Sequence, residues 1–584
     1  MSSLDNLLDI SKKLEGVARH ASVHAAGVVI ADKDLVEYTP IQRETNGEKV
    51  VTQYDMYMVG EDGVGLLKMD FLGLRNLTII EETLKFIKQN QNQTVDLNQV
   101  PLDDKLAYEL LGQGETTGIF QLESAGMRRY IKELKPTSIF DLQAMVALYR
   151  PGPMQNIPEF IARKRSPELI TYPHEKLEVI LKESYGVLTF QDDVLLTAII
   201  LAGYSWLDAD KFRKAMGKKI PSEMKKQEEM FIDGCQKNGI SEKKAKEIFD
   251  LIAPFAGYGF NKAHAACYAM IAFRTAYLKA HFPVEFMTAV LTAESRGTTG
   301  PQKNEKISQA VAECRRLDVP ILQPDINASN SDFSIENNTA IRFGLSAIKN
   351  VGSAAIDSII AARSTKKFVS VQDFCSRVDL GKVNKKTLES LIKAGAFDSF
   401  GNRASLLISM PDVVAKIAKS KKNESQGQSS LFDNEESQDD NQNITYFDVD
   451  DFSLEEKLSF EKEFLGFYLT SHPHMETLSR IRLMTTHEIE LIESEKEGTL
   501  IKIGGIIEAM RKIVTKKSNA EMAFITIGDD KGITVECVVF PKVFEESKTF
   551  LITDSVILIE GRLDSKDEQP VVIANKISSA KDVL

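Results

Sequence analysis

The sequence predicts a mixed, mainly helical multidomain protein that ends in a small β-barrel. The chain has 584 residues, 43% of them hydrophobic, which is too long for a single hydrophobic core. Residues 76–320 repeat apolar positions with the helical period between proline and glycine breaks. Residues 498–580 instead alternate apolar and polar side chains, as strands do. These patterns indicate several domains of different class.

The composition indicates the cellular compartment of the protein and says less about its binding partners. The five cysteines are scattered, without a Cys-x-x-Cys pair, which argues against a zinc site and a disulfide framework and favours a reducing cytoplasm. The sequence has no apolar run of 18 residues, so we expect no membrane partner. The net charge of −12 is an average over several domains. It therefore does not exclude a surface that binds nucleic acid on any one of them.

The first 75 residues predict a helix followed by two strands. Residues 1–19 have the apolar spacing of a helix, and His20 leads through small residues into a buried strand that ends at Ile30. A second strand, 65–71, carries Asp70 within an apolar run. Such an acid is either salt-bridged, with Arg75 as one candidate partner, or catalytic.

A second acidic pattern lies close by. Asp32 and Asp34 form an Asp-x-Asp pair at the polar end of the first strand. Because this pair precedes a loop, we do not favour it as a metal site.

Three cationic segments lie within the helical region. Arg150 stands at the start of a rigid Arg-Pro-Gly-Pro turn, and two arginines follow the Gly-punctuated segment 114–123. Residues 211–219 hold five cations, of which Lys211, Lys214 and Lys218 share one helical face. A solvated helix face would explain each segment alone. Together they favour a pocket for polyphosphate or nucleic acid.

The segment 257–283 predicts a long helix capped by Asn261 and ended by a proline. Lys262 and unpaired N–H groups in its first turn are suited to holding a phosphate. His264, Tyr268 and Thr275 fall on one edge of this helix. The alternative is an ordinary core helix with a Gly-rich entry.

From about residue 321 the pattern changes. Residues 341–363 predict a helix, a hairpin at Asn350-Val-Gly352 flanked by Lys349, and a second helix. The N–H groups of such a hairpin can meet a DNA phosphate without reading bases. A weaker unit of the same kind spans 385–397. An ordinary αα-hairpin is the alternative.

Two further segments complete the chain. The polar tract 419–445 predicts a linker with one apolar pair, Leu431-Phe432, three residues after Gln428; the pair makes a chance contact or forms a docking peptide. Five strands follow within 498–580, with a helix at 542–549 between the third and fourth, which is the order of an OB-fold. This barrel is either a single-strand binder or a non-binding scaffold.

Five motifs give the chain a specific resemblance. In this order and at this spacing they resemble the C family of DNA polymerases, that of the bacterial replicative polymerase III alpha subunit, over nearly the whole chain. The motifs are Lys68-Met-Asp-Phe-Leu-Gly-Leu-Arg75, Gly118-Ile-Phe-Gln-Leu-Glu123, Arg150-Pro-Gly-Pro153, Phe212-Arg-Lys-Ala-Met-Gly-Lys-Lys219 and Gly257-Tyr-Gly-Phe-Asn-Lys-Ala-His264.

The resemblance implies a role for each candidate residue. Asp70 is then the catalytic palm carboxylate that holds Mg²⁺, and Gln428-Ser-Ser-Leu-Phe432 is the motif that binds the sliding clamp. Lys349, Asn350 and Gly352 belong to the DNA-binding hairpin. The nucleotide-binding residues are expected to be Arg150, Arg213, Lys214, Lys218, Tyr258, Lys262 and His264.

The family pattern also implies the domain order. We expect a palm remnant over 1–75, fingers over 76–320, a helix-hairpin-helix and clamp-binding domain over 321–418, a flexible segment over 419–450, a connector over 451–495 and an OB-fold over 496–584. The expected function is templated deoxynucleotide addition by two-Mg²⁺ phosphoryl transfer, with primer-template DNA, deoxynucleoside triphosphates, the sliding clamp and other replicase subunits as partners.

One departure from the family is decisive for activity. Nothing before Asp70 resembles the Pro-Asp-x-Asp-x-Asp motif that supplies the other two metal ligands, and one carboxylate cannot organise two Mg²⁺ ions. The family's PHP domain, most of its palm, its thumb and its last domain also have no counterpart here. We therefore expect a C-terminal portion of a polymerase, inactive without its N-terminal half. The alternative is a non-catalytic DNA- and clamp-binding protein.

Overall fold

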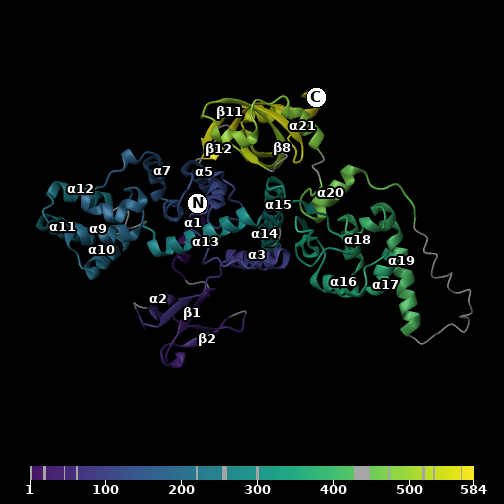
Figure 1. Cartoon of the computed structure of the whole chain (residues 1–584), viewed down its shortest axis with the longest axis horizontal. Helices are drawn as coiled ribbons and strands as arrows, with labels where there is room; N and C mark the ends of the chain where they lie inside the picture. Colours follow the sequence, from purple (N-terminus) through teal and green to yellow (C-terminus); the bar gives the residue numbers. More distant parts are fainter. Residues whose placement is uncertain are drawn as a thin grey trace, which may run out of the picture. The chain divides into compact units, whose positions relative to one another are not determined.

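The computed structural model describes residues 3–17, 22–44, 47–60, 63–218, 221–252, 259–297, 301–425, 447–470, 474–515, 520–529, 533–566 and 569–583. By its internal contacts the chain divides into two compact units, Met1–Arg75 and Asn76–Leu584. Figure 1 labels many of the helices and strands of both units. Each unit is considered by itself.

Unit 1 consists of short elements. The helix predicted at the N-terminus spans Ser3–Leu14 (α1), and β4 carries Asp70 as its last residue. Strand β1 pairs antiparallel with β4, and β2 pairs antiparallel with β3. The remaining elements are β1 (Gly27–Ile30), η1 (Leu35–Glu37), β2 (Ile41–Arg43), β3 (Val50–Thr52), α2 (Met56–Val59) and β4 (Leu67–Asp70).

Unit 1 buries very little of its apolar surface. Among its described residues, Val59 is the one hydrophobic side chain that is fully buried. The apolar stripe of α1, which includes Leu4, Leu7 and Leu14, is exposed along its length. A stretch of this size without a packed core lacks the main stabilising contribution to folding.

The first part of unit 2 is helical, as predicted. Its helices are α3 (Arg75–Gln91), α4 (Lys105–Gly112), α5 (Ala125–Leu134), α6 (Ile139–Leu148), α7 (Ile157–Arg165), α8 (Glu178–Leu181), α9 (Gln191–Ala202), α10 (Trp206–Lys218), α11 (Pro221–Lys237), α12 (Glu242–Ile252), α13 (Lys262–His281), α14 (Pro283–Gly297) and α15 (Pro301–Arg316). Helices α9 to α12 enclose a core of their own around Phe212, Phe231 and Phe249.

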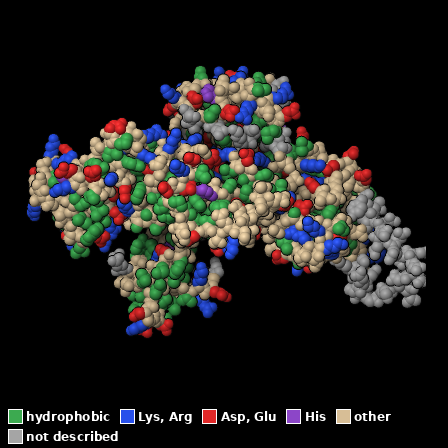
Figure 2. Space-filling view, viewed as in Figure 1, with side chains coloured by type: hydrophobic (Ala, Val, Ile, Leu, Met, Phe, Trp, Pro, Cys, Tyr) green, Lys and Arg blue, Asp and Glu red, His purple; other side chains and the backbone are tan. Residues whose placement is uncertain are grey.

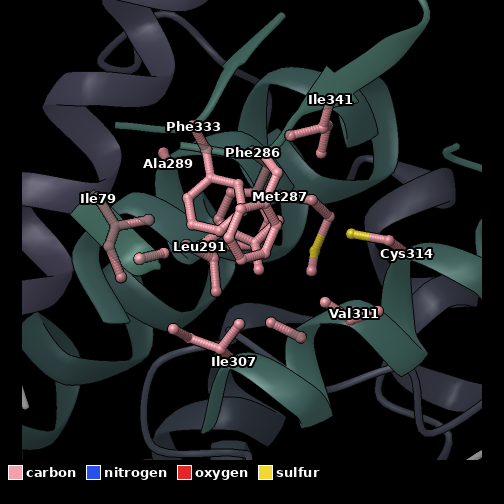
Figure 3. Close-up of a cluster of buried hydrophobic side chains, with 14 of the residues drawn as sticks. Ile79, Phe286, Met287, Ala289, Leu291, Ile307, Val311, Cys314, Phe333 and Ile341 are labelled. Atoms are coloured by element: carbon pink, nitrogen blue, oxygen red, sulfur yellow. The ribbon is translucent and has the colours of Figure 1, made fainter. Parts of the chain in front are cut away.

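The larger core of unit 2 joins segments that are far apart in the sequence. Figure 3 shows Phe286, Met287, Leu291 and Phe333 within one cluster of buried hydrophobic side chains. Ile79 of α3 also contributes to this cluster. The core thereby ties the start of the helical region to the segment that follows it.

The segment after residue 320 corrects one sequence prediction. Residues expected to form the first helix of the hairpin unit instead form β7 (Ala340–Arg342) and the 3₁₀ turn η7 (Leu345–Ala347). An apolar run this short has no reliable helical period, and β7 pairs with both β5 and β6. The other elements are β5 (Ile321–Leu322), β6 (Ser334–Glu336), α16 (Ser353–Thr365), α17 (Val371–Arg377), α18 (Lys385–Lys393), α19 (Arg403–Ser425), α20 (Leu454–Phe464) and α21 (Met475–Arg482).

The C-terminal strands close into a barrel, which confirms the predicted OB-fold order. Their order around the barrel is β10-β12-β11-β8-β9, and the side chains inside it include Ile503, Ile525 and Val572. The elements are β8 (Leu500–Val514), β9 (Glu521–Gly528), β10 (Thr534–Val539), α22 (Pro541–Ser547), β11 (Val556–Lys566) and β12 (Gln569–Ser579). In the described part of the chain, no helix has the length and hydrophobicity needed to cross a membrane.

Candidate functional site

Asp70 ends β4 with its carboxylate held by two neighbours. Lys68 donates a hydrogen bond from Nζ to Oδ1 of Asp70 at 2.6 Å, and Nδ1 of His24 lies 3.7 Å from the same oxygen. The hydrogen bond from Lys68 is the main reason why the pKa of Asp70 lies below its ordinary value. Asp70 is therefore a charged carboxylate at neutral pH.

Asp32 and Asp34 do not join Asp70 in a cluster among the described residues of unit 1. Asp32 accepts a hydrogen bond from the hydroxyl of Tyr38 at 2.5 Å, and Asp34 begins the turn η1. Within the described ranges, no group of three or more His, Cys, Asp or Glu side chains is arranged to hold a metal ion. Asp70 by itself does not fit a two-metal centre, which needs several oxygen ligands for each ion.

A row of aromatic rings organises the candidate site in unit 2. The guanidinium carbon of Arg150 lies 3.8 Å from the ring centre of Phe260. The centroid of Phe260 is 5.0 Å from that of His264, and the His264 centroid is 4.2 Å from that of Tyr268. Tyr268 in turn contacts Phe120 with 4.9 Å between centroids. We call Phe260, His264, Tyr268 and Phe120 the ring row.

The ring row brings together two of the predicted nucleotide-binding residues. Arg150 follows α6 in a turn where Gly152 has a φ of 105°, a conformation that favours glycine. Its guanidinium lies over the ring of Phe260, and a guanidinium has five N–H donors of the kind that bind a phosphate. His264 is exposed on the same row. The site thus combines a cation, an imidazole and stacking surfaces.

Thr275 fixes the far end of the row. Its hydroxyl lies in hydrogen-bonding distance of two carbonyls of α13, and it accepts a hydrogen bond from the backbone N–H of Phe120 at 3.2 Å. The predicted polar edge of α13 therefore positions the segment 114–123, which carries Phe120. Sequence reasoning found this edge but missed Phe120 and Phe260 as its ring partners.

The start of α13 already has hydrogen-bond and ion-pair partners. The backbone N–H of Lys262 donates to Asp192 at 2.8 Å, and that of His264 donates to its cap, Asn261, at 2.8 Å. The ammonium group of Lys262 is paired with Glu183 at 3.0 Å. The prediction of unpaired N–H groups here is wrong, because two carboxylates and one amide already occupy this end.

The α10 cations form a separate group. Arg213 donates two hydrogen bonds to Asp210, and Lys214 lies 3.4 Å from the same carboxylate. Helix α10 packs through Phe212 into the α9 to α12 core and not into the ring row. Trp206, the one tryptophan of the chain, is exposed at the start of this helix. The side chain of Lys218 and all of Tyr258 lie outside the described residues.

A buried acid supports the strand-like segment beside the ring row. Asp193 is 1% exposed, and one of its oxygens accepts hydrogen bonds from the N–H groups of Thr189 and Phe190. Burial raises the pKa of Asp193 to about 6 in spite of these hydrogen bonds. The segment 189–190 in turn meets Phe260 through a parallel bridge.

Asp193→Asn is expected to change how stability depends on pH. The pKa of Asp193 is about 6 in the folded state, against 3.8 for an ordinary aspartate. The folded state therefore holds the proton more tightly and loses stability as pH rises through that window. Asn keeps one acceptor oxygen and cannot ionise. Between pH 4 and pH 6.5, the variant should gain on the order of 2–3 kcal/mol relative to the wild type. Urea unfolding followed by circular dichroism measures this, and parallel pH profiles would contradict it.

The hairpin at residues 349–352 is built against α18. Asn350 has a φ of 66°, its side chain donates to Ser390 at 3.1 Å, and its carbonyl accepts from Thr387 at 3.1 Å. The backbone N–H of Lys349 donates to Phe464. Lys349, Asn350 and Gly352 are exposed at the start of α16. The clamp-binding candidates Gln428, Leu431 and Phe432 lie outside the described residues.

The comparisons with known proteins follow the same order along the chain. Residues 1–73 match the family model described as the bacterial DNA polymerase III alpha NTPase domain, and residues 76–239 match that of the bacterial DNA polymerase III alpha subunit finger domain. DNA polymerase III subunit alpha of Borreliella burgdorferi is 40% identical over 98% of this chain and 49% of its own length. The chain belongs to the bacterial DNA polymerase III alpha-subunit family.

Further matches agree with this membership. The DNA polymerase III subunits alpha of Bacillus subtilis and Escherichia coli are each 39% identical to this alpha-family chain, over 100% and 96% of it and over 51% and 49% of their own lengths. A helix-hairpin-helix motif model matches residues 318–406, and an OB-fold nucleic acid binding domain model matches residues 501–580. The chain spans about half the length of the curated relatives it matches.

Proposed function

We propose that the chain supplies the nucleotide-binding and DNA-binding half of a replicative DNA-directed DNA polymerase in the bacterial cytoplasm. The observation that carries this proposal is the ring row with Arg150 stacked on it, in a segment that matches the finger model. Arg150 is an exposed cation of the kind that binds phosphate, and it lies beside aromatic side chains of the kind on which a base stacks. A deoxynucleoside triphosphate has both features.

Asp70 is the proposed catalytic carboxylate. It ends a strand in the segment that matches the alpha-subunit model, and it is charged at neutral pH. We assign to it one ligand position for Mg²⁺, the ion whose role in phosphoryl transfer is to neutralise developing charge. Within the described ranges no group of three or more possible ligand side chains surrounds Asp70, so we propose that the remaining ligands come from the half of the relatives' length that this chain does not match.

The remaining segments are proposed to bind nucleic acid and replicase partners. The exposed hairpin residues Lys349, Asn350 and Gly352 are suited to contacting a duplex phosphate. On the barrel, Arg511 lies 5.0 Å from the ring centre of Phe524, an arrangement that suits a single strand. Gln428, Leu431 and Phe432 remain the proposed sliding-clamp motif, and other replicase subunits remain proposed partners.

Primer extension tests the proposal. The purified chain is incubated with primed single-stranded DNA, Mg²⁺ and the four deoxynucleotides, alone and after co-expression with the unmatched half of the Borreliella burgdorferi relative. We expect no extension by the chain alone and extension by the co-expressed pair. DNA binding is measured on the same samples by fluorescence anisotropy.

Two results would change this assignment. DNA binding without extension in either sample would favour the alternative function, a non-catalytic DNA- and clamp-binding protein. Extension by the chain alone would mean that Asp70 finds its partner carboxylates within this chain, with Asp32 and Asp34 as the first residues to replace.

A further inference from the structure

A hollow in unit 2 lies between α3, α14 and the turn that joins β6 to β7. Its volume is about 680 Å³, within the roughly 300–1000 Å³ of pockets that hold small molecules. Its lining includes Phe86 and Gln89 of α3, Thr292 of α14 and Asn338 of the turn. Phe333 also lines it and belongs to the buried cluster in Figure 3. We call this site the α3–α14 hollow; it shares no lining residue with the ring row.

One wall of the hollow carries a buried hydroxyl without a hydrogen bond. Thr292 is 2% exposed, and its Oγ1 has no hydrogen-bond partner among the described residues. An unsatisfied buried donor opposes folding, and such groups are rare in native structures. Thr288, one turn earlier on the same helix, shows the usual arrangement, because its hydroxyl donates to the carbonyl of Val284 at 2.7 Å. The hydroxyl of Thr292 is thus available to a ligand in the hollow.

The cations of the lining are already paired with carboxylates. Arg296 donates two hydrogen bonds to Asp332, at 2.6 and 3.2 Å. The ammonium group of Lys85 lies 3.0 Å from Glu81 and 3.5 Å from Glu82. Figure 2 shows cationic and anionic side chains interspersed over the face of unit 2 that it draws. Because both cations have acidic partners, the hollow favours an uncharged ligand over a phosphate.

The uncharged side chains of the lining indicate the kind of ligand. Gln89 and Asn338 are exposed, and an amide offers both donors and an acceptor. Such an amide can pair in bidentate fashion with the N6 and N7 atoms of adenine. The half-buried ring of Phe86 is of the kind on which a base stacks. An adenine nucleoside combines a flat apolar face, a donor and acceptor edge, and sugar hydroxyls.

We propose that the α3–α14 hollow binds an adenine nucleoside through its uncharged base and sugar. The amide of Gln89 or Asn338 pairs with the base edge, and the ring of Phe86 lies beside the base. The hydroxyl of Thr292 hydrogen-bonds to the ligand and thereby gains the partner that it lacks. This inference does not rest on the proposed function, because the hollow is lined by neither Asp70 nor Arg150.

Calorimetric titration of the full chain with adenosine, without DNA or Mg²⁺, tests the proposal. The wild type is compared with Thr292→Val, which removes the hydroxyl and keeps the shape of the side chain. Thr288→Val is the matched control, because Thr288 is buried on the same helix and does not line the hollow. Gln89→Ala is a second variant, at an exposed position where the core is not disturbed. Ribose and adenosine monophosphate are titrated into the wild type as further probes.

We expect the wild type to bind adenosine with a Kd below about 1 mM. Thr292→Val and Gln89→Ala should each bind it at least ~10-fold more weakly, since each loses a hydrogen bond to the ligand. Thr288→Val should bind adenosine as the wild type does. Urea unfolding should show Thr292→Val to be at least as stable as the wild type, because the hydroxyl that it removes has no partner among the described residues.

Three results would overturn the proposal. The first is the absence of adenosine binding by the wild type. The second is an equal affinity of Thr292→Val and Thr288→Val for adenosine, which is also the result expected if adenosine binds beside Arg150 instead. The third is at least ~10-fold tighter binding of ribose or adenosine monophosphate than of adenosine, which would indicate a sugar or phosphate site.

Discussion

Asp70→Asn is expected to abolish nucleotide addition by the reconstituted polymerase while leaving DNA binding unchanged. The substitution keeps the size of the side chain and removes the charge that Lys68 and His24 now stabilise. Loss of a metal ligand should cost more than the 10–100-fold typical of a residue that only supports a ligand. We therefore expect kcat to fall by more than about 10²-fold. Single-nucleotide incorporation under rapid-quench conditions measures it.

The control for this experiment is Asp34→Asn. Asp34 is a carboxylate of the same unit that makes no side-chain hydrogen bond to the turn it precedes. It should retain full activity. If the two variants lose activity equally, Asp34 shares the metal site and the interpretation of Asp70 as the lone acid of this chain is wrong. If neither loses activity, Asp70 is not catalytic.

Lys279→Ala is expected to lower the free energy of unfolding by about 3–5 kcal/mol, the usual cost of leaving a buried charge without its partner. Lys279 is 1% exposed, ion-paired with Glu313, and donates to the carbonyls of Glu115 at 2.8 Å and Thr117 at 2.9 Å. Burial lowers the pKa of Lys279, which shows how much the environment opposes its charge. Removing it leaves the two carbonyls without this donor and leaves Glu313 with Arg316, 3.2 Å away, as its remaining ion-pair partner.

Amide hydrogen exchange can show which segment loses stability in the Lys279→Ala variant. Lys279 connects α13 to the segment 114–123, so the amides of that segment should exchange faster in the variant. Lys306→Ala serves as the control, because its pair with Glu294 is at the surface at 3.8 Å and should contribute less than about 1 kcal/mol. A variant at Lys279 that is as stable as this control would show that the buried pair contributes nothing net.

Local sequence patterns predicted the helices and strands of the fold. The arrangement of the candidate site, in contrast, depends on contacts between residues that are far apart in the sequence. The period-two alternation after residue 498 and the cap at Asn261 are local signals, and both appear in the structure. The segment before Asn350 was mistaken for a helix because a short apolar run suits either a helix or a strand.

The candidate site was predictable only in part. Arg150 and His264 were predicted from the family resemblance, but Phe260 joins them through ring contacts that no spacing reveals. The acid that blocks the start of α13 comes from Asp192, 70 residues away. The available signal was the pair of acids at 192–193, which the structure places in the first turn of α9, a position where carboxylates are favoured.

Because Trp206 is exposed, it can serve as an intrinsic fluorescence probe of the segment that matches the finger model. It is the only tryptophan in the chain, 68% exposed at the start of α10. The native emission spectrum therefore reports on one helix, the same helix that carries Arg213 and Lys214. Quenching or a blue shift on adding a nucleotide would locate binding at α10, whereas binding confined to the ring row would leave the emission unchanged. Tryptophan fluorescence can thus distinguish nucleotide bound at the α10 cations from nucleotide bound at Arg150 beside the ring row, without an added label.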